Sequence, residues 1–505
     1  MDVLLGVDAG TSEIKAVAIT PTGDERAIAT HSVPTQHPQP QWAEQDMAIV
    51  WERTAGCLSR VVDQLPSDAR IRGLSIAGQG DGCWLVDEAG EPVRNAILWS
   101  DSRAADYVDA WSETGVHKDI ERICGSGLFP GTVLPLLTWL DDEEPDRLAA
   151  AATLFFCKDW LAYKLTDQRA TELSDASLPL LDIRTQSYSD AVFEYTDLAA
   201  YTDLRPPLVE AGSIVGSVRE TAAAATDLPV GTPVVAGLFD VGASALGCGA
   251  ISSGESVSSI GTSVVNQSIT ATPSINASGV QIALWENLYT EAVGSNAGTR
   301  SIEWVRDELL GGPGTPYTEL EERAHSVPIG AAGVTYLPYL SATGERGPFV
   351  DPNARAQLLG LDPIHTTDHI VRAVYEGLAL ALRHCYEALP TTATTLFLTG
   401  GPTRSAFWNQ LVADCMDVDI LVPIDTEITA TGVALLAGVG TDVYSDVETG
   451  IEHALSSPTR YRPDQQRVEQ YDKLYEQYTA LLDRMAEVWR MQAETRDQLS
   501  NQSER

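Results

Sequence analysis

Lysine is almost absent from this chain of 505 residues. Only five of its 33 basic residues are lysines, and 71 Asp and Glu residues bring the formal net charge to −38. Such an acidic surface repels polyanions, so we expect neither nucleic acid nor an anionic membrane among its partners. An acid excess with so little lysine is typical of proteins from salt-loaded halophile cytoplasm, where salt screens self-repulsion. An ordinary acidic enzyme is the alternative.

Cysteine pairs, long apolar runs and a basic leader are also missing. The seven cysteines are odd in number and form no CxxC pair, so we expect neither a disulfide framework nor a zinc site. No apolar run approaches the ~18 residues that span a bilayer. The start MDVLLGVDAG lacks the basic region of a signal peptide, so we expect a cytoplasmic protein. With 44% hydrophobic residues, 11 Trp and 16 Tyr, the chain is not disordered.

Strand and helix patterns alternate along the chain, which predicts an α/β fold. A weak repeat relates residues 6–20 to residues 258–270, because both place GTS at a turn between two strand-like segments. Two such halves would form a cleft between them, although three shared residues can also be a coincidence. From residue 468 to 488, apolar and aromatic residues recur every three or four positions, which predicts one amphipathic helix packed on the second domain.

The segment GVDAGTSEIK at 6–15 predicts a phosphate-binding hairpin. Gly10 lets backbone N–H groups approach an anion, and Thr11 and Ser12 add hydroxyl donors. Asp8 suits a magnesium ligand acting through water, and Lys15 could neutralise phosphate. A plain hairpin with an Asx-type turn would have the same local sequence.

Two further glycine turns predict anion or nucleotide contacts. Gly261 and Thr262 form the second GTS turn, and Gly400 and Gly401 stand between a strand and a helix that begins near Ser405. No P-loop pattern GxxxxGK[ST] and no GxGxxG fingerprint occurs. A bound nucleotide would therefore sit in a different fold.

Asp240 ends the apolar strand PVVAGLF and opens a glycine-rich helix. A carboxylate at this position projects into a cleft, where it can accept a proton from a substrate hydroxyl during phosphoryl transfer. The alternative is a helix N-cap.

Taken together, these motifs resemble the FGGY carbohydrate kinases of the actin-like ATPase superfamily. The colinear segments are DAGTS at 8–12, WAEQD at 42–46, ILWSDSRA at 97–104, CKDWLAYKLT at 157–166 with TELSDAS at 171–177, GLFDVGASALGCG at 237–249, GERGPFVDPNARAQLLGL at 344–361 and TGGPTRSAFWNQLVAD at 399–414. One departure is Leu136, where the family often has lysine.

The resemblance implies two ribonuclease-H-like α/β domains flanking a deep cleft, with ATP and Mg²⁺ as cofactors. It implies an N-terminal sugar-binding domain over 1–244, a C-terminal ATP-binding domain over 245–450 and a helical extension over 451–505. Asp240 would be the general base, and Asp8 and Asp240 would hold Mg²⁺ through water. The implied phosphate and nucleotide contacts are Asp8, Gly10, Thr11, Ser12, Lys15, Gly261, Thr262, Gly400, Gly401 and Asn409. A homodimer is compatible with the sequence, which does not determine the oligomeric state.

The substrate loop reads AGQGDG at 77–82. Typical D-xylulose kinases carry Met-His after the glutamine and glycerol kinases carry Arg-Glu, whereas Gly80 and Asp81 stand here. The loop is more similar to that of kinases of L-xylulose, erythritol or xylitol. Side chains expected at the sugar are Gln79, Gly80, Asp81, Asp101, Arg103 and Asp240.

These features predict an ATP-dependent kinase of a xylulose-type ketose. Kinases of erythritol, xylitol, another polyol or glycerol are the alternatives within the class. A nucleotide-switch ATPase of the actin-like superfamily is the alternative outside it, although such proteins lack the sugar loop. A third hypothesis is an inactive sugar sensor. The intact Asp8, Asp240 and GTS motif argue against it, because a sensor would not need them.

Overall fold

The computed structural model describes residues 1–275, 279–425 and 427–503. The chain divides into two compact units. The first comprises Met1–Ser253, Ile269–Glu291 and Asp425–Ser456, and the second comprises Gly254–Ser268, Ala292–Ile424 and Ser457–Arg505. The boundaries predicted at residues 244 and 450 and the cleft stay predictions.

Six strands form the first sheet, in the order β13-β14-β5-β1-β2-β3. β1 (Asp2–Ala9) pairs antiparallel with β2 (Glu13–Ile19) and parallel with β5 (Arg70–Gly78). β5 pairs parallel with β14, and β14 pairs antiparallel with β13. The remaining bounds are β3 Glu25–Ser32, β13 Ile214–Ser217 and β14 Pro233–Val235.

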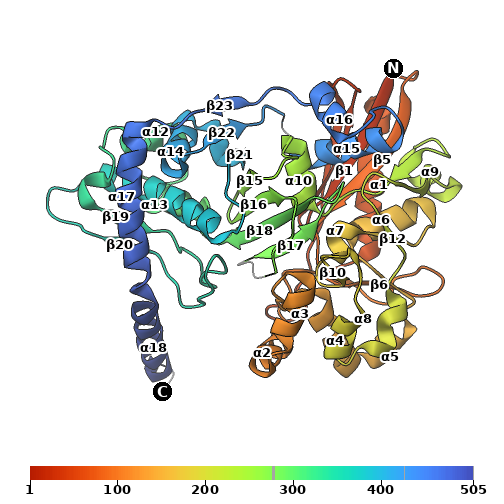
Figure 1. The fold of residues 1–505 in the computed structure, drawn as a ribbon, viewed down its shortest axis with the longest axis horizontal. Coiled ribbons are helices and arrows are strands. Elements are labelled where there is room, and N and C mark those ends of the chain that lie inside the picture. The colour runs from red at the N-terminus through yellow and green to blue at the C-terminus, as the bar shows by residue number, and fades with distance from the viewer. Residues whose placement is uncertain (276–278, 426, 504–505) are drawn as a thin grey trace. The chain divides into compact units, whose positions relative to one another are not determined.

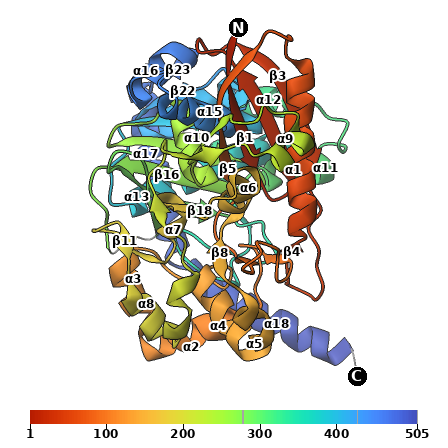
Figure 2. The ribbon, with the colours of Figure 1, turned by 90° about the vertical axis from the view of Figure 1, so that its right-hand side faces the viewer.

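Helices cover both faces of this sheet, which explains why β1 is apolar almost throughout. Side chains of a strand alternate between faces. Leu5 and Val7 join the core that includes α1 (Met47–Gln64), whereas Gly6 faces α15 (Ile428–Gly440). A Cβ added at Gly6 would lie 1.9 Å from the Ala430 carbonyl oxygen, so this close helix–strand contact requires glycine. Figure 1 shows α15 beside β1 and β5, and Figure 2 shows α1 along β3.

The second sheet has the order β17-β18-β16-β15-β21-β22-β23 and repeats the plan of the first. β15 pairs antiparallel with β16 and parallel with β21, β21 pairs parallel with β22, and β22 pairs antiparallel with β23. The predicted repeat is therefore confirmed, with GTS at the β15–β16 turn. The bounds are β15 Glu255–Ile260, β16 Val264–Thr270, β17 Val280–Ala283, β18 Tyr289–Ser295, β21 Thr395–Gly400, β22 Asp419–Val422 and β23 Thr459–Tyr461.

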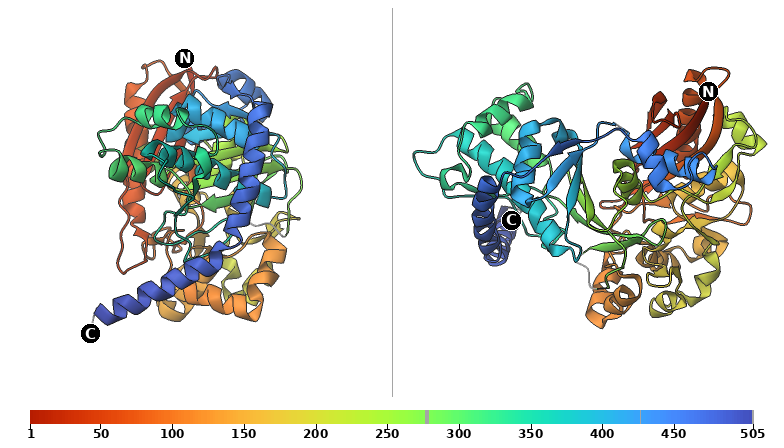
Figure 3. Two further views of the ribbon diagram at one scale, coloured as in Figure 1. Left: turned by 90° about the vertical axis from the view of Figure 1, so that its left-hand side faces the viewer. Right: turned by 45° about the horizontal axis from the view of Figure 1, so that its top comes forward.

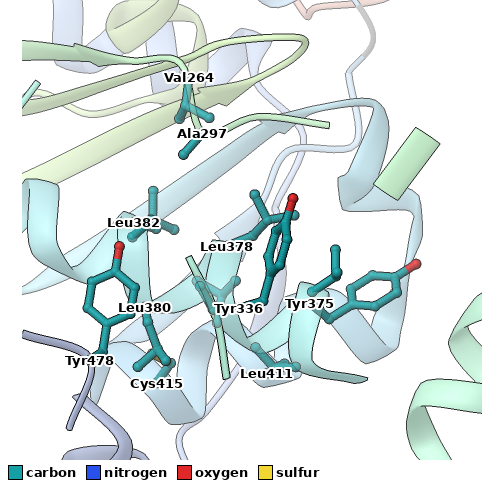
Figure 4. Close-up of a cluster of buried hydrophobic side chains, with 14 of the residues drawn as sticks. Val264, Ala297, Tyr336, Tyr375, Leu378, Leu380, Leu382, Leu411, Cys415 and Tyr478 are labelled. Atoms are coloured by element: carbon teal, nitrogen blue, oxygen red, sulfur yellow. The ribbon is translucent and has the colours of Figure 1, made fainter. Parts of the chain in front are cut away.

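The core of the second unit is built around α13 (Thr367–Ala388) and α14 (Ala406–Met416). Figure 4 shows Leu378 and Leu382 of α13 on the side of the cluster that faces Val264 and Ala297. Each unit thus carries its own mixed sheet and helices, which confirms the predicted two-domain α/β fold.

The C-terminal segment forms two helices where the sequence predicted one. These are α17 (Gln465–Leu482) and α18 (Met485–Ser503), and Figure 3 shows the bend between them. The break comes where the Asp483 N–H bonds to both Thr479 and Leu481 carbonyls, which tightens the last turn of α17. Tyr471 and Tyr478 are buried in the core of the second unit, so the predicted packing is confirmed.

All seven cysteines, each within the described residues, are buried thiols outside any disulfide, as predicted. Across the described part of the chain, no helix has both the length and the apolar content that a membrane span needs.

Candidate active site

Asp8 lies at the carboxyl end of β1, and the turn that follows is held by a ring of hydrogen bonds. The Thr11 hydroxyl donates to Gln79 Oε1 over 2.9 Å and accepts from Trp99 Nε1 over 3.0 Å. Gln79 Nε2 donates to Gln45 Oε1 over 2.9 Å, and Gln45 Nε2 donates to the Thr11 carbonyl over 2.6 Å. The first phosphate motif and the substrate loop are therefore fixed to each other, as neighbouring parallel strands that end at one edge allow.

The remaining residues of this hairpin are more open. Ser12 is exposed, whereas Gly10 is tightly placed, because a Cβ added there would lie 3.1 Å from the Glu13 carbonyl oxygen. Lys15 Nζ lies 3.2 Å from Glu427 Oε2 and 3.5 Å from Glu13 Oε2. A role of Lys15 in neutralising phosphate stays a prediction, since the lysine here pairs with two carboxylates.

Asp240 is the first residue of α10 (Asp240–Cys248), and four residues separate it from the end of β14. Burial raises its pKa well above the usual range, and the charges of Asp8 and Asp175 raise it further, while the Val241 N–H opposes them. Burial also raises the pKa of Asp8 to about 6, although Lys15 counteracts it. The charge of Asp8 therefore disfavours ionisation of Asp240.

The substrate loop lies against Asp240 through its neighbour Phe239. Gly78 forms a parallel bridge with Phe239, and a Cβ added at Gly80 would lie 2.4 Å from the Phe239 ring. Asp81 adopts a left-handed conformation with φ of 54°. Its buried Oδ1 has no hydrogen-bond partner in the described part of the chain. Burial, Asp175 and Asp240 all raise the pKa of Asp81.

Asp101 and Arg103 bind each other and the segment 42–44. Asp101 accepts from the Ala43 N–H over 2.6 Å and forms an ion pair with Arg103 over 2.8 Å. Arg103 also pairs with Glu44 over 2.8 Å, and its guanidinium carbon lies 3.8 Å from the Trp42 ring centroid. Both side chains are fully enclosed by protein, so the structure uses them to hold two segments together. Their sugar contacts stay a prediction.

A buried charged cluster next to Asp240 was not predicted as part of the site. Lys158 Nζ on α6 (Cys157–Thr166) lies 2.8 Å from Asp175 Oδ2, 2.9 Å from Asp159 Oδ1 and 3.6 Å from Glu172 Oε2. Of the five lysines, all within the described residues, Lys158 alone is buried. Burial by itself lowers the pKa of Lys158, but Asp159 and Asp175 raise it, so the amine stays charged. The available sequence signal was the adjacent charged pair Lys158–Asp159 next to the apolar residues Cys157 and Trp160.

In the second unit, the turn of Gly261 and Thr262 is exposed and packed against a second glycine. The Thr299 N–H donates to the Gly261 carbonyl over 2.8 Å. A Cβ added at Gly298 would lie 2.4 Å from the carbonyl oxygens of both Gly261 and Thr262, so only glycine fits there.

The third glycine turn lies beside the second, because β15 and β21 are parallel neighbours. Gly400 has φ of 99°, and a Cβ added to it would lie 2.1 Å from the Ile260 carbonyl oxygen. Asn409 is buried on α14, its Nδ2 donates to the Thr403 carbonyl over 2.8 Å, and its Oδ1 has no partner among the residues described. A small hollow adjoins these turns, lined by Ile260, Gly298, Thr299, Pro402 and residues of α13.

Comparisons with known proteins agree with this arrangement. Residues 3–247 match the N-terminal domain of the FGGY family of carbohydrate kinases, and residues 256–441 match the C-terminal domain of that family. The chain is 31% identical to an erythritol kinase of Brucella abortus over 97% of each chain. It is 30% identical to a xylulose kinase of Bacillus subtilis over 95% of this chain and 96% of the other. The crystal structure of a xylulose kinase from Rhodospirillum rubrum matches with a TM-score of 0.90 and 26% identity, over 97% of this chain and 100% of that chain.

Proposed function

The chain belongs to the FGGY family of carbohydrate kinases, and we propose that it transfers the γ-phosphoryl group of ATP to a xylulose-type ketose, with Asp240 as the general base. The observation that carries the assignment of the base is that Phe239, the residue directly before Asp240, contacts Gly78 at the end of β5 and Gly80 of the substrate loop. The erythritol kinase and the xylulose kinase named above are almost equally similar to this chain. A four-carbon polyol is therefore the second candidate for the acceptor.

In the proposed reaction, the Asp240 carboxylate takes the proton of the acceptor hydroxyl. The hydroxyl oxygen then forms a bond to the γ-phosphorus, the bond from that phosphorus to the bridging oxygen breaks, and ADP leaves. The raised pKa of Asp240 makes its carboxylate a stronger base than an exposed aspartate. Asp81, with its unpartnered Oδ1, supplies a polar group for another hydroxyl of the acceptor.

ATP would be held by the glycine turns of the second unit. The turns at 261–262 and 400–401 present backbone groups to an anion, and a hollow with an apolar lining adjoins them.

Asp8 fits a magnesium ion that keeps most of its water. Among the described residues, no group of three His, Cys, Asp or Glu side chains could hold a metal by itself. Magnesium in kinases is commonly held by one or two carboxylates together with water and substrate phosphates, a requirement that Asp8 and Asp240 meet. When bound, the ion would neutralise charge on the phosphate oxygens.

A panel of acceptors tests the assignment. Initial rates with ATP would be compared for both xylulose enantiomers, ribulose, erythritol, xylitol and glycerol in high salt. We expect a xylulose to exceed glycerol in kcat/KM by at least about tenfold, because an ill-fitting acceptor leaves buried polar groups unpaired. A best rate with erythritol would select the second candidate, and a best rate with glycerol would contradict both.

Asp81→Asn tests the substrate loop. Asparagine tolerates the left-handed backbone of this position but replaces the carboxyl group with an amide. We expect kcat/KM for the acceptor to fall by about 10- to 100-fold, and KM for ATP to stay within about twofold. Asp197→Asn is the matched control, since Asp197 also has positive φ (59°) and is exposed. Unchanged acceptor kinetics in Asp81→Asn would remove Asp81 from the acceptor site.

The charge of −38 predicts salt-dependent activity. We propose that the chain is adapted to concentrated salt, so activity should rise with KCl into the molar range. The Debye length is already about 8 Å at 0.15 M salt and about 3 Å at 1 M, so salt screens both self-repulsion and repulsion of ATP. A KCl series with constant Mg·ATP measures this, and an optimum below about 0.2 M would contradict salt adaptation.

A further inference from the structure

The peptide that leads into Asp240 is held from two directions. On one side, Phe239 forms the parallel bridge with Gly78 at the end of β5. On the other side, the Phe239 N–H donates to the hydroxyl of Ser174 over 2.8 Å. The Phe239 carbonyl accepts from the Ala243 N–H over 2.9 Å, which starts α10. The backbone before Asp240 therefore has little freedom, and Ser174 is the side chain that restrains it.

Ser174 is itself fixed by the buried charged cluster. It lies on the short helix α7 (Leu173–Ala176), it is fully buried, and its hydroxyl donates to Glu172. Lys158 lies near Glu172 and forms an ion pair with Asp175, the residue that follows Ser174. A buried hydroxyl that has both an acceptor and a donor partner has one defined orientation.

We propose that Ser174 is a positioning residue for Asp240, acting through the Phe239 N–H to aim the catalytic carboxylate at the acceptor hydroxyl. The inference rests on the proposed role of Asp240. Loss of the Ser174 hydroxyl would free the peptide at Phe239 and let the carboxylate turn away from its productive direction. A misplacement of about 1 Å at a reacting group can reduce turnover strongly. ATP binding in the second unit does not depend on this hydrogen bond.

Ser177→Ala provides a matched control. Ser177 is also fully buried next to α7, its hydroxyl accepts from the Ala283 N–H over 3.2 Å, and it donates to the Ser174 carbonyl over 2.6 Å. Both substitutions remove a buried hydroxyl with one backbone donor and one acceptor, so their structural effects should be similar. Only Ser174 contacts the peptide next to Asp240.

The test measures kcat, KM for ATP and the urea unfolding midpoint. We expect Ser174→Ala to lower kcat by about tenfold with KM for ATP within about twofold, while Ser177→Ala keeps kcat within about twofold and loses similar stability. Equal kcat losses in the two variants, or no loss in Ser174→Ala, would overturn the proposal. If Ser174→Ala does not fold, Ser174→Cys keeps the volume with a weaker acceptor, and wild-type kcat in that variant would overturn it equally.

Asp240→Asn separates this inference from the proposed function. If Asp240→Asn keeps normal turnover, the general base is wrong and the inference falls with it. If Asp240→Asn loses turnover while Ser174→Ala matches Ser177→Ala, only the positioning role is wrong. Adding Ser174→Ala to Asp240→Asn should cost less than about twofold more, because the hydroxyl acts through Asp240. A further loss of about tenfold would show an effect by another route and overturn the proposal.

Discussion

Asp240→Asn should lower kcat by ~10²–10⁴-fold, the range for loss of a general base, while ATP still binds. The amide cannot take the proton of the acceptor hydroxyl, but it has almost the same volume as the carboxyl group. Steady-state kinetics and a binding titration with ATP would measure the two effects. Near-normal turnover would remove Asp240 from the mechanism.

The same variant should be at least as stable as the wild type at neutral pH. Burial, Asp8 and Asp175 raise the pKa of Asp240, so the folded protein becomes less stable as pH rises above the unfolded value of 3.8. A neutral amide avoids that loss. Asp446→Asn is the control, because Asp446 also stands at a helix start, where it accepts from the Thr449 N–H over 2.7 Å. Hydrogen bonds from Thr449 lower the pKa of Asp446, so loss of its charge should cost some stability at neutral pH while activity stays full.

Lys158→Met should be the most damaging single change to stability. It removes the ammonium group from three buried carboxyl groups, and breaking a buried ion pair from one side costs about 3–5 kcal/mol in free energy of unfolding. Urea unfolding monitored by tryptophan fluorescence would measure the loss. Lys164→Met on the same helix is the control, since the Lys164 amine lies 5.1 Å from the Trp160 ring centroid and is only half-buried. We expect it to cost about 1 kcal/mol or less.

The loss in Lys158→Met should shrink as pH falls. Burial raises the pKa of Glu172 to about 8 and that of Asp175 to about 6, and Lys158 lowers both. Without Lys158, both groups would be protonated at still higher pH, so a lower pH neutralises them and removes the repulsion. The difference from wild type should therefore be smaller at pH 5 than at pH 8. An equal difference at both values would contradict the assigned role of the charge.

Local turn chemistry made part of the site predictable from sequence. Gly10, Gly261 and Gly400 were identified because a turn that follows a strand and binds an anion needs glycine. A few neighbouring residues are enough to recognise such a turn in the sequence. Asp240 was identified from the apolar segment PVVAGLF that precedes it, although only Pro233–Val235 of that segment forms a strand. The repeated GTS predicted that the second half contains a hairpin of the same kind as the first.

Interactions between distant segments could not be predicted in this way. The ring of Thr11, Gln79 and Gln45 joins residues 34 and 68 positions apart. Lys158 meets Asp175 only because α6 and α7 fold together, and periodicity gives no sign of such a pairing. For the same reason, the sequence did not show that Asp101 and Arg103 bind each other and the segment 42–44.

The most direct test of the proposed kinase activity is to compare the amounts of all products formed in one reaction. The protein would be incubated with Mg·ATP and a xylulose in high salt, and ADP, inorganic phosphate and phosphorylated acceptor would be quantified together. We predict equal amounts of ADP and phosphorylated acceptor, and negligible ADP when the acceptor is omitted. ADP and inorganic phosphate formed at the same rate without any acceptor, and no phosphorylated product with it, would contradict the account.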